Sequence, residues 1–405
     1  MTAPLSGLKV IEVGVAMAGP FCGMMLGDYG ADVLKVERVA LGDDSRHWPP
    51  YFEGKLGHYY ASANRNKRSI AVNLKSKEGA EIARRLIRDA DVIVDNYRMG
   101  ALARAGLDYD SLSALNPRLI YCSISGFGAS GPRQGDPAND LFMQAFSGGM
   151  SITGEIGGGP VKMGISVADI GAGMLGTIGI LMAVEARHRT GRGQRVDTSL
   201  LEGQVAMLSY HLTRFFATDI VPGPGGSGSG GSVPYQAFKA ADDWVVVAAF
   251  NERMWKDFCE AAGRVEWFDD PRFCSANARA AHRDLLLGLI NEVFATRPAA
   301  HWLERLTAHG VPTSPVNRLD QMVQEEQVRA RDMIVGIDVP EVGLIRMAGL
   351  PIKMSETAGH IQHPPPRLGE HTNSILQALG YTEFDITRLA EAGTIGLDET
   401  RPPVA

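Results

Sequence analysis

The segment KVIEVGVAMAGPFCGMMLGDYGADVLKVE (Lys9–Glu37) contains two short apolar runs separated by a turn and a stretch of helical length. Lys9–Val13 is predicted to be a buried strand, and Asp32–Glu37 a second strand. Between them, Pro20–Tyr29 is predicted to be a helix, because proline suits the first helical position, where its missing N–H loses no partner. A strand, a helix and a strand in this order are typical of a parallel βαβ unit.

The same alternation continues along the first half of the chain. Further helices are predicted over Glu78–Asp89 and around Asp110–Leu115. Further strands are predicted over Asp91–Asp95 and Leu119–Ser123. Short strands that alternate with amphipathic helices indicate an α/β fold, with a Rossmann-like parallel sheet and helices on both of its faces.

A glycine-rich stretch at 223–231, GPGGSGSGG, interrupts this pattern. Six glycines in nine positions cannot pack a core, so the stretch is predicted to be a linker or a mobile loop. We expect it to close over the active site, because glycine permits hinges and close backbone approach. After it, the sequence predicts a β-hairpin that turns at Ala241–Asp243 and then several helices. Residues 223–330 are therefore expected to hold the linker and a smaller α+β domain.

Composition excludes several classes of protein. The 405 residues carry 40 Lys and Arg against 46 Asp and Glu, a net charge of −6, so neither nucleic acid nor an anionic membrane is an expected partner. Four widely spaced cysteines indicate neither a disulfide framework nor zinc, and no metal site is expected. The first residues lack a signal peptide pattern, and Ile170–Val184 is shorter than the ~20 residues of a membrane span. A cytoplasmic globular protein is expected.

The turn Gly14–Gly19 is a candidate phosphate site, because a helix start presents free N–H groups. Arg38, after the second strand, would suit a phosphate attached to a ribose. The turn is not G-x-G-x-x-G, however, and a simple tight turn is the alternative interpretation. The basic stretch Asn64–Arg68 is interpreted as a solvated loop rather than an anion site.

Asp169 lies in the segment GISVADIGAGMLG at 164–176. If Ser166 caps a helix, Asp169 takes the third helical position, and its carboxylate can complete a capping box. Alternatively, the helix dipole keeps Asp169 ionised for chemistry, and the glycines that follow let a ligand or another backbone approach. Spacing alone favours the capping box and leaves the second interpretation open.

Several segments together resemble the class III CoA-transferases, the family that contains formyl-CoA transferase. The resemblance extends from residue 6 to about 380, and its segments are Val10–Glu37, Asn64–Leu74 (NRNKRSIAVNL), Asp95–Arg98 (DNYR), 116–128 (NPRLIYCSISGFG), 166–173 (SVADIGAG), 190–203 (TGRGQRVDTSLLEG) and 364–372 (PPPRLGEHT). It implies a coenzyme A thioester as substrate, small carboxylic acids as the other substrates, and no tightly bound cofactor.

The resemblance also implies an architecture and a nucleophile. The chain would be one half of an interlocked, ring-like homodimer, with a large domain built from residues 1–222 and 331–405. Asp169 would attack the donor thioester to give a mixed anhydride, and the CoA thiolate would convert this to an aspartyl-CoA thioester. The incoming acid would then reverse these steps. Covalent intermediates divide one difficult exchange into easier ones.

Matching positions imply two groups of binding residues. Trp48, Tyr59 and Asn139 would border the acyl pocket. Met17 replaces a glutamine of formyl-CoA transferase and Asn139 a tyrosine of many relatives, so oxalate and formate are not the expected acids. The segment GGSVPYQAFKAADDWVVVAA at 230–249 looks closest to relatives that use succinyl-CoA, so we expect dicarboxylates such as succinate, malate, mesaconate, itaconate or a methylated malate. The implied CoA contacts are Val15, Met17, Ala18, Arg38, Asn73, Leu74, Lys75, Asn96, Tyr97, Arg98 and Arg104.

Other functions remain open on the same scaffold. An α-methylacyl-CoA racemase needs an acid/base pair, normally His and Asp, where this chain reads Pro137–Asp140 without a histidine. An intramolecular transferase would move CoA between the two carboxyls of one branched dicarboxylate, such as mesaconate, and would use the same Asp169. A CoA-binding regulator without activity would leave the intact Asp169 unexplained.

Overall fold

The computed structural model describes residues 2–228 and 232–398. The predicted lid at 223–231 therefore lies partly outside the described residues. The chain divides into two compact units. The first comprises Met1–Gly149, Met163–Phe216 and Arg329–Ala405, and the second Met150–Lys162 and Ala217–Val328. The domain boundaries expected at residues 222 and 330 stay predictions.

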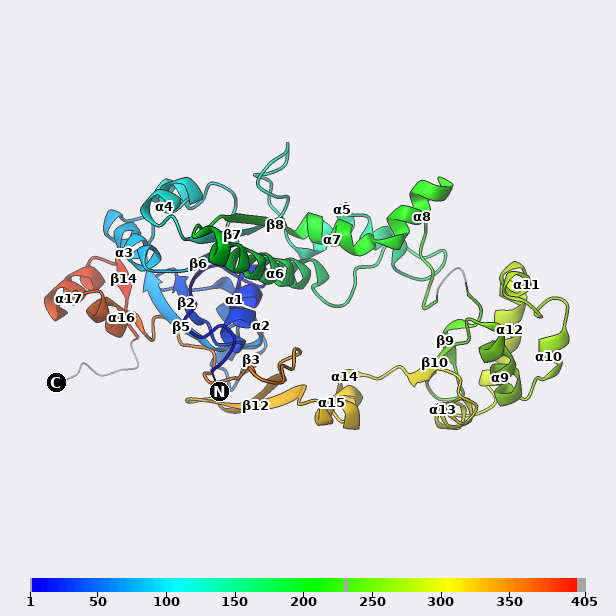
Figure 1. Ribbon diagram of the computed structural model, residues 1–405. Helices are drawn as coiled ribbons and strands as arrows, with labels where there is room; N and C mark the ends of the chain where they lie inside the picture. The colour runs from blue at the N-terminus through cyan, green and yellow to red at the C-terminus, as the bar shows by residue number, and fades with distance from the viewer. Residues whose placement is uncertain (1, 229–231, 399–405) are drawn as a thin grey trace. The chain divides into compact units, whose positions relative to one another are not determined.

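A seven-stranded sheet forms the centre of the first unit (Figure 1). The strand order is β14-β5-β2-β1-β6-β7-β8, and every pairing is parallel except that of β14 with β5. The predicted α/β class with a mostly parallel sheet is thus confirmed. The strands are β1 (Lys9–Val13), β2 (Asp32–Glu37), β5 (Lys67–Val72), β6 (Val92–Asp95), β7 (Ile120–Ser125), β8 (Arg195–Ser199) and β14 (Ile395–Gly396).

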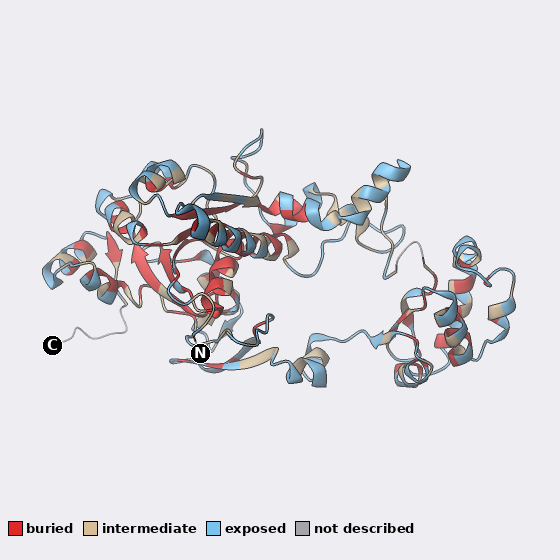
Figure 2. Ribbon diagram, in the orientation of Figure 1, coloured by how far each residue is buried: buried red, intermediate tan, exposed pale blue. Residues whose placement is uncertain are grey.

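Successive side chains of each central strand point to opposite faces of the sheet, so each strand contributes residues to the hydrophobic cores on both faces. Val10 packs with residues of α1 (Ala18–Asp28) and α6 (Val167–Thr190), whereas Ile11 belongs to the core on the other face. Figure 2 shows the central strands as buried. The second face is covered by α3 (Lys77–Arg88), α4 (Tyr109–Leu115), α16 (Thr372–Ala378) and α17 (Glu383–Glu391).

Helix α1 begins at Ala18, two residues earlier than predicted, so Pro20 takes the third helical position rather than the first. The difference costs no hydrogen bond, because the first four N–H groups of any helix have no partner within it.

The basic stretch Asn64–Arg68 is not a solvated loop, and that interpretation was wrong. Arg65 is buried and forms an ion pair with Asp28 at 2.7 Å. Lys67 is buried in β5 and lies 2.7 Å from a carboxylate oxygen of Glu12. Burial of these cations is tolerable because each one is paired with a carboxylate.

Helix α6 has 24 residues and is long and apolar enough, by length and composition, to cross a membrane. The length argument made from Ile170–Val184 was therefore wrong. A core helix passes the same test, and α6 packs against α1, β7 and β8.

The second unit has its own core. The predicted hairpin is confirmed, with β9 (Tyr235–Lys239) antiparallel to β10 (Trp244–Ala248). Strand β11 (Thr313–Pro315) completes this small sheet. Aromatic rings fill the core, and Phe294 stacks on Trp302 with ring centroids 4.7 Å apart. The helices are α9 (Glu252–Ala262), α10 (Glu266–Asp269), α11 (Ala276–Ala281), α12 (Arg283–Phe294) and α13 (Ala299–Ala308).

The remaining elements are short. They are β3 (Tyr51–Phe52), β4 (Leu56–Gly57), α2 (His58–Ala63), α5 (Asp140–Phe146), α7 (Leu200–Leu208), α8 (Tyr210–Thr218), α14 (Leu319–Met322), α15 (Glu326–Ala330), β12 (Ile334–Val339) and β13 (Gly343–Ala348), with 3-10 turns at Asp44–His47, Ala103–Ala105 and Gly149–Ile152.

Candidate active site

The loop between β1 and α1 is fastened to the end of β6. The Asn96 side chain accepts a hydrogen bond from the Val15 N–H and donates one to the Val15 carbonyl, both at 2.9 Å. A Cβ atom at Gly14 or Gly19 would lie 3.0 Å from the Asn96 side chain. The close approach therefore favours glycine at both positions, which accounts for two glycines of the GVAMAG turn.

Asp169 occupies the third position of α6, as predicted, but it takes no part in a capping box. Ser166 stands at the N-cap position without a side-chain capping bond. One N–H of the first turn is satisfied from elsewhere, because a carboxylate oxygen of Asp140 accepts the Ala168 N–H at 2.9 Å. The capping interpretation of Asp169 was wrong, and its carboxylate is left available to a cavity.

The Asp169 cavity has a volume of about 420 Å³ and lies within the first unit. Trp48 and Tyr59 form one wall, with their rings edge to face at 4.9 Å. Asn139 caps α5 by accepting the Phe142 N–H at 3.0 Å. The lining residues are Val15, Ala16, Met17, Ala18, Trp48, Tyr59, Asn96, Ile124, Ser125, Gly126, Ala138, Asn139, Asp140, Leu141, Ser166, Asp169 and Leu200.

Burial raises the pKa of Asp169 to about 7, and the negative charge of Asp140 adds to the rise. The carboxylate is therefore more basic than an exposed aspartate and ionises close to neutral pH. Burial also raises the pKa of Tyr59 to about 12, with Asp169 contributing and a hydrogen bond from Ser166 opposing. Tyr59 thus remains a neutral hydroxyl donor at physiological pH.

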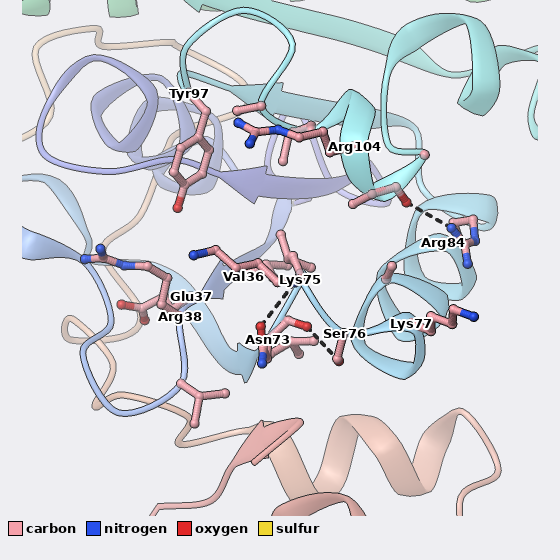
Figure 3. Close-up of a pocket in the computed structure, with 18 of the residues that line it drawn as sticks. Val36, Glu37, Arg38, Asn73, Lys75, Ser76, Lys77, Arg84, Tyr97 and Arg104 are labelled. Atoms are coloured by element: carbon pink, nitrogen blue, oxygen red, sulfur yellow. Dashed lines mark hydrogen bonds between the residues drawn. The ribbon is translucent and has the colours of Figure 1, made fainter. Parts of the chain in front are cut away.

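A larger cavity of about 1220 Å³ lies between the loop after β6 and the start of α3 (Figure 3). We call it the Arg104 cavity. The Arg38 side chain borders it and also donates to the Gly42 carbonyl and to the carboxylate of Asp44. The lining includes five basic residues, which suit phosphate groups: Arg38, Lys75, Lys77, Arg84 and Arg104.

The two cavities hold all of the implied CoA contacts except Arg98. Neighbours in sequence connect them, since Asn96 lines the Asp169 cavity and Tyr97 the Arg104 cavity. Arg98 is exposed and lines neither one. The role of all these implied contact residues in CoA binding stays a prediction. The Asp169 cavity holds Val15, Met17, Ala18 and Asn96, and the Arg104 cavity holds Arg38, Asn73, Leu74, Lys75, Tyr97 and Arg104.

Sequence reasoning missed two basic residues of the Arg104 cavity. Lys77 and Arg84 both lie on α3 and both line the cavity. Their spacing of seven residues places them on one helix face, two turns apart, and this signal was available in the sequence. Arg84 also donates to the Ala105 carbonyl at 2.9 Å, which ties α3 to the loop after β6.

Glu37 lies at the edge of the Arg104 cavity, but its carboxylate is already engaged. Arg46 binds it at 2.7 Å, and the Ser69 hydroxyl donates to it at 2.6 Å. These contacts tie the end of β2 to the 3-10 turn at Asp44–His47 and to β5, and they leave no free acid. Within residues 2–228 and 232–398, no group of three or more His, Cys, Asp or Glu side chains is placed to hold a metal ion.

The arrangement suits an anionic, extended ligand. A basic cavity can take phosphate groups, and the adjoining smaller cavity contains one basic carboxylate beside neutral hydrogen-bond donors. A carboxylate with a raised pKa can act as a nucleophile or as a proton acceptor.

Comparisons with known proteins agree with this geometry. CoA-transferase family III matches residues 5–372. The chain is 38% identical to the succinate–glutarate CoA-transferase of Agrobacterium fabrum, over 95% of this chain and 98% of that protein. It is 37% identical to the succinyl-CoA:mesaconate CoA-transferase of Haloarcula hispanica, over 93% of this chain and 96% of that one.

A solved structure shares the fold. The crystal structure of a CaiB/BaiF family protein from Brucella suis superposes with a TM-score of 0.85 at 36% identity, over 94% of this chain and all of that chain. Sequence similarity over nearly the full length of both chains, together with this fold, shows that the protein belongs to CoA-transferase family III.

Proposed function

We propose that this CoA-transferase moves CoA from succinyl-CoA to a second dicarboxylate, with Asp169 as the covalent nucleophile. The observation that carries the proposal is the Asp169 carboxylate at the start of α6, which makes no helix-capping bond. Its pKa is raised, and it lies beside a basic cavity. Two relatives of similar identity are named for dicarboxylates of different structure, glutarate and mesaconate. The dicarboxylate class is therefore better supported than any one acceptor.

The reaction would run through two kinds of covalent intermediate. The Asp169 carboxylate attacks the thioester carbonyl, the C–S bond breaks, and CoA leaves as a thiolate from a mixed anhydride. The thiolate then attacks the aspartyl carbonyl, which releases the donor as a free carboxylate and leaves an aspartyl-CoA thioester. The acceptor carboxylate attacks this thioester to form a second anhydride and thiolate. Attack of that thiolate on the acceptor carbonyl restores Asp169 and forms the new thioester.

The surroundings of Asp169 fit these steps. A raised pKa makes the carboxylate a stronger nucleophile, and an anhydride is close in energy to a thioester, so each step is reversible. The lining of the Asp169 cavity, all of it described, contains no lysine or arginine. Neutral donors such as Ser125 and Asn139 are available to the distal carboxylate of the acid.

Trapping the intermediate tests the proposal. The protein is incubated with succinyl-CoA, quenched with hydroxylamine, and its Asp169 peptide examined by mass spectrometry. A hydroxamate on Asp169 is the expected result, and Asp169→Asn should show none. An unmodified Asp169 in protein that turns over succinyl-CoA would refute the covalent mechanism.

Isotopic labelling separates the other reactions open to this scaffold. Labelled free acid should enter the thioester product, whereas an intramolecular transferase would exclude it. A racemase would instead exchange the α-proton of a branched acyl-CoA in deuterated water, at a rate that does not depend on added acid.

The proposal includes an interlocked homodimer and a cytoplasmic location. A sedimentation mass of one chain would contradict the dimer.

A further inference from the structure

The loop that borders Asp169 adopts a backbone conformation that its sequence does not favour. Ala16 has a φ of +62°, in the left-handed region that residues with a Cβ rarely occupy. Ala16 and its neighbour Met17 both line the Asp169 cavity. An unfavourable conformation at such a position persists only if the surrounding contacts hold it.

Asp43 supplies the contact that holds Ala16. One of its carboxylate oxygens accepts the Ala16 N–H at 3.0 Å, and it also accepts the Ser45 N–H at 2.9 Å and the Ser45 hydroxyl at 2.7 Å. The Asp43 residue is 1% exposed. It lines neither the Asp169 cavity nor the Arg104 cavity, so it is not placed to touch the substrate.

A buried lysine connects Asp43 to the other end of the same loop. The Lys35 ammonium lies 3.0 Å from the second Asp43 oxygen and 2.7 Å from Glu12, and it donates to the Gly14 carbonyl at 2.9 Å. Lys35 therefore holds the start of the loop while Asp43 holds its third residue. Asn96 fixes the residue between them, Val15.

We propose that Asp43 is a positioning residue for CoA transfer, which keeps Ala16 left-handed and so fixes the loop Gly14–Met17 beside Asp169. Its kinetic effect rests on the proposed function, and its effect on CoA binding does not. If Asp43 acts through the conformation of Ala16, a glycine at position 16 should replace it, because glycine adopts the left-handed region without penalty.

A rescue experiment tests this cause. Asp43→Ala should lower kcat/KM for succinyl-CoA at least tenfold, mainly through KM, and addition of Ala16→Gly should recover at least threefold. Glu341→Gly is the matched control, because Glu341 has a φ of +66° in the turn between β12 and β13. It should recover nothing in the Asp43→Ala background and leave the wild-type rate unchanged. Asp43→Ala within twofold of wild type, or equal recovery by both glycines, would overturn the proposal.

Binding of free CoA, measured by titration calorimetry, gives the same test without turnover. The Kd should rise at least tenfold in Asp43→Ala and fall back with Ala16→Gly but not with Glu341→Gly. An unchanged Kd would overturn the positioning role even if transfer from succinyl-CoA is never observed. If Asp43→Ala does not fold, Asp43→Leu, which has the branching of aspartate but no oxygen to accept the Ala16 N–H, is taken through the same series.

Discussion

Replacement of Asp169 by asparagine should stabilise the protein at the pH at which the enzyme would work. The carboxylate pKa rises from its ordinary value of 3.8 to about 7, because burial and Asp140 both disfavour the ionised form. The folded state therefore binds more protons than the unfolded chain between these values. Its stability consequently falls as pH rises from about 4 to about 7, and the full cost is present above that range.

The structure bounds the size of this effect. A rise of the pKa from 3.8 to about 7 corresponds to about 4 kcal/mol as an upper limit. Solvent reaches part of the Asp169 side chain and screens its charge, so we expect about 2 kcal/mol. Asparagine has nearly the same shape and removes the charge, so Asp169→Asn should gain this amount at pH 8 and almost nothing at pH 4.

Urea unfolding of wild type and variant at several pH values, at one protein concentration, measures the difference in free energy of unfolding. Asp338→Asn is a suitable control, because Asp338 is exposed on β12 and should change stability little at any pH. If the variant is no more stable at pH 8, or if its gain in stability does not depend on pH, then the surroundings of Asp169 do not disfavour its charge.

Two further predictions concern the charge of Asp169 and the packing of helical glycines. In the proposed mechanism Asp169 attacks the thioester in its ionised form, so kcat/KM should fall as pH drops through about 7. Asp140→Asn, which removes the neighbouring charge, should lower the pKa of Asp169 and move this limb to lower pH in a pH–rate profile. An unmoved limb would contradict the role given to Asp140. Gly173→Ala should reduce activity and stability, because its Cβ would lie 2.8 Å from the Ala18 carbonyl oxygen on α1. Gly288→Ala, in open space on α12, should instead stabilise by about 0.5–1 kcal/mol, and equal thermal midpoints for the two variants would refute the packing argument.

The first βαβ unit could be predicted closely because its signals are local. Lys9–Val13 and Asp32–Glu37 are strands with the predicted bounds, since each is an apolar run between turn residues. The basic stretch Asn64–Arg68 failed for the opposite reason. Its buried charges are tolerated only because Asp28 and Glu12, which lie far away in the sequence, meet them in the fold. A single sequence gives no local signal for such pairs.

The candidate site shows the same division between local and distant causes. The position of Asp169 at the start of a helix follows from local spacing, but its chemical state does not. A capping box would have used its carboxylate, but no capping bond forms, and Asp140, 28 residues before Ala168, accepts the Ala168 N–H of the same first turn. The same Asp140 then raises the pKa of Asp169 by its charge.

Asp169 also differs from three buried carboxylates of this unit in what faces it. Glu12, Asp28 and Glu37 each have a lysine or arginine at 2.7 Å, which offsets the cost of burial. Throughout the described part of the chain, no cation or hydrogen-bond donor is placed on the Asp169 carboxylate, and the strongest influences on it are burial and a second negative charge. Sequences usually satisfy buried groups and depart from this rule at functional sites. The unmatched carboxylate is thus a feature that packing does not explain and that the proposed nucleophilic chemistry would require.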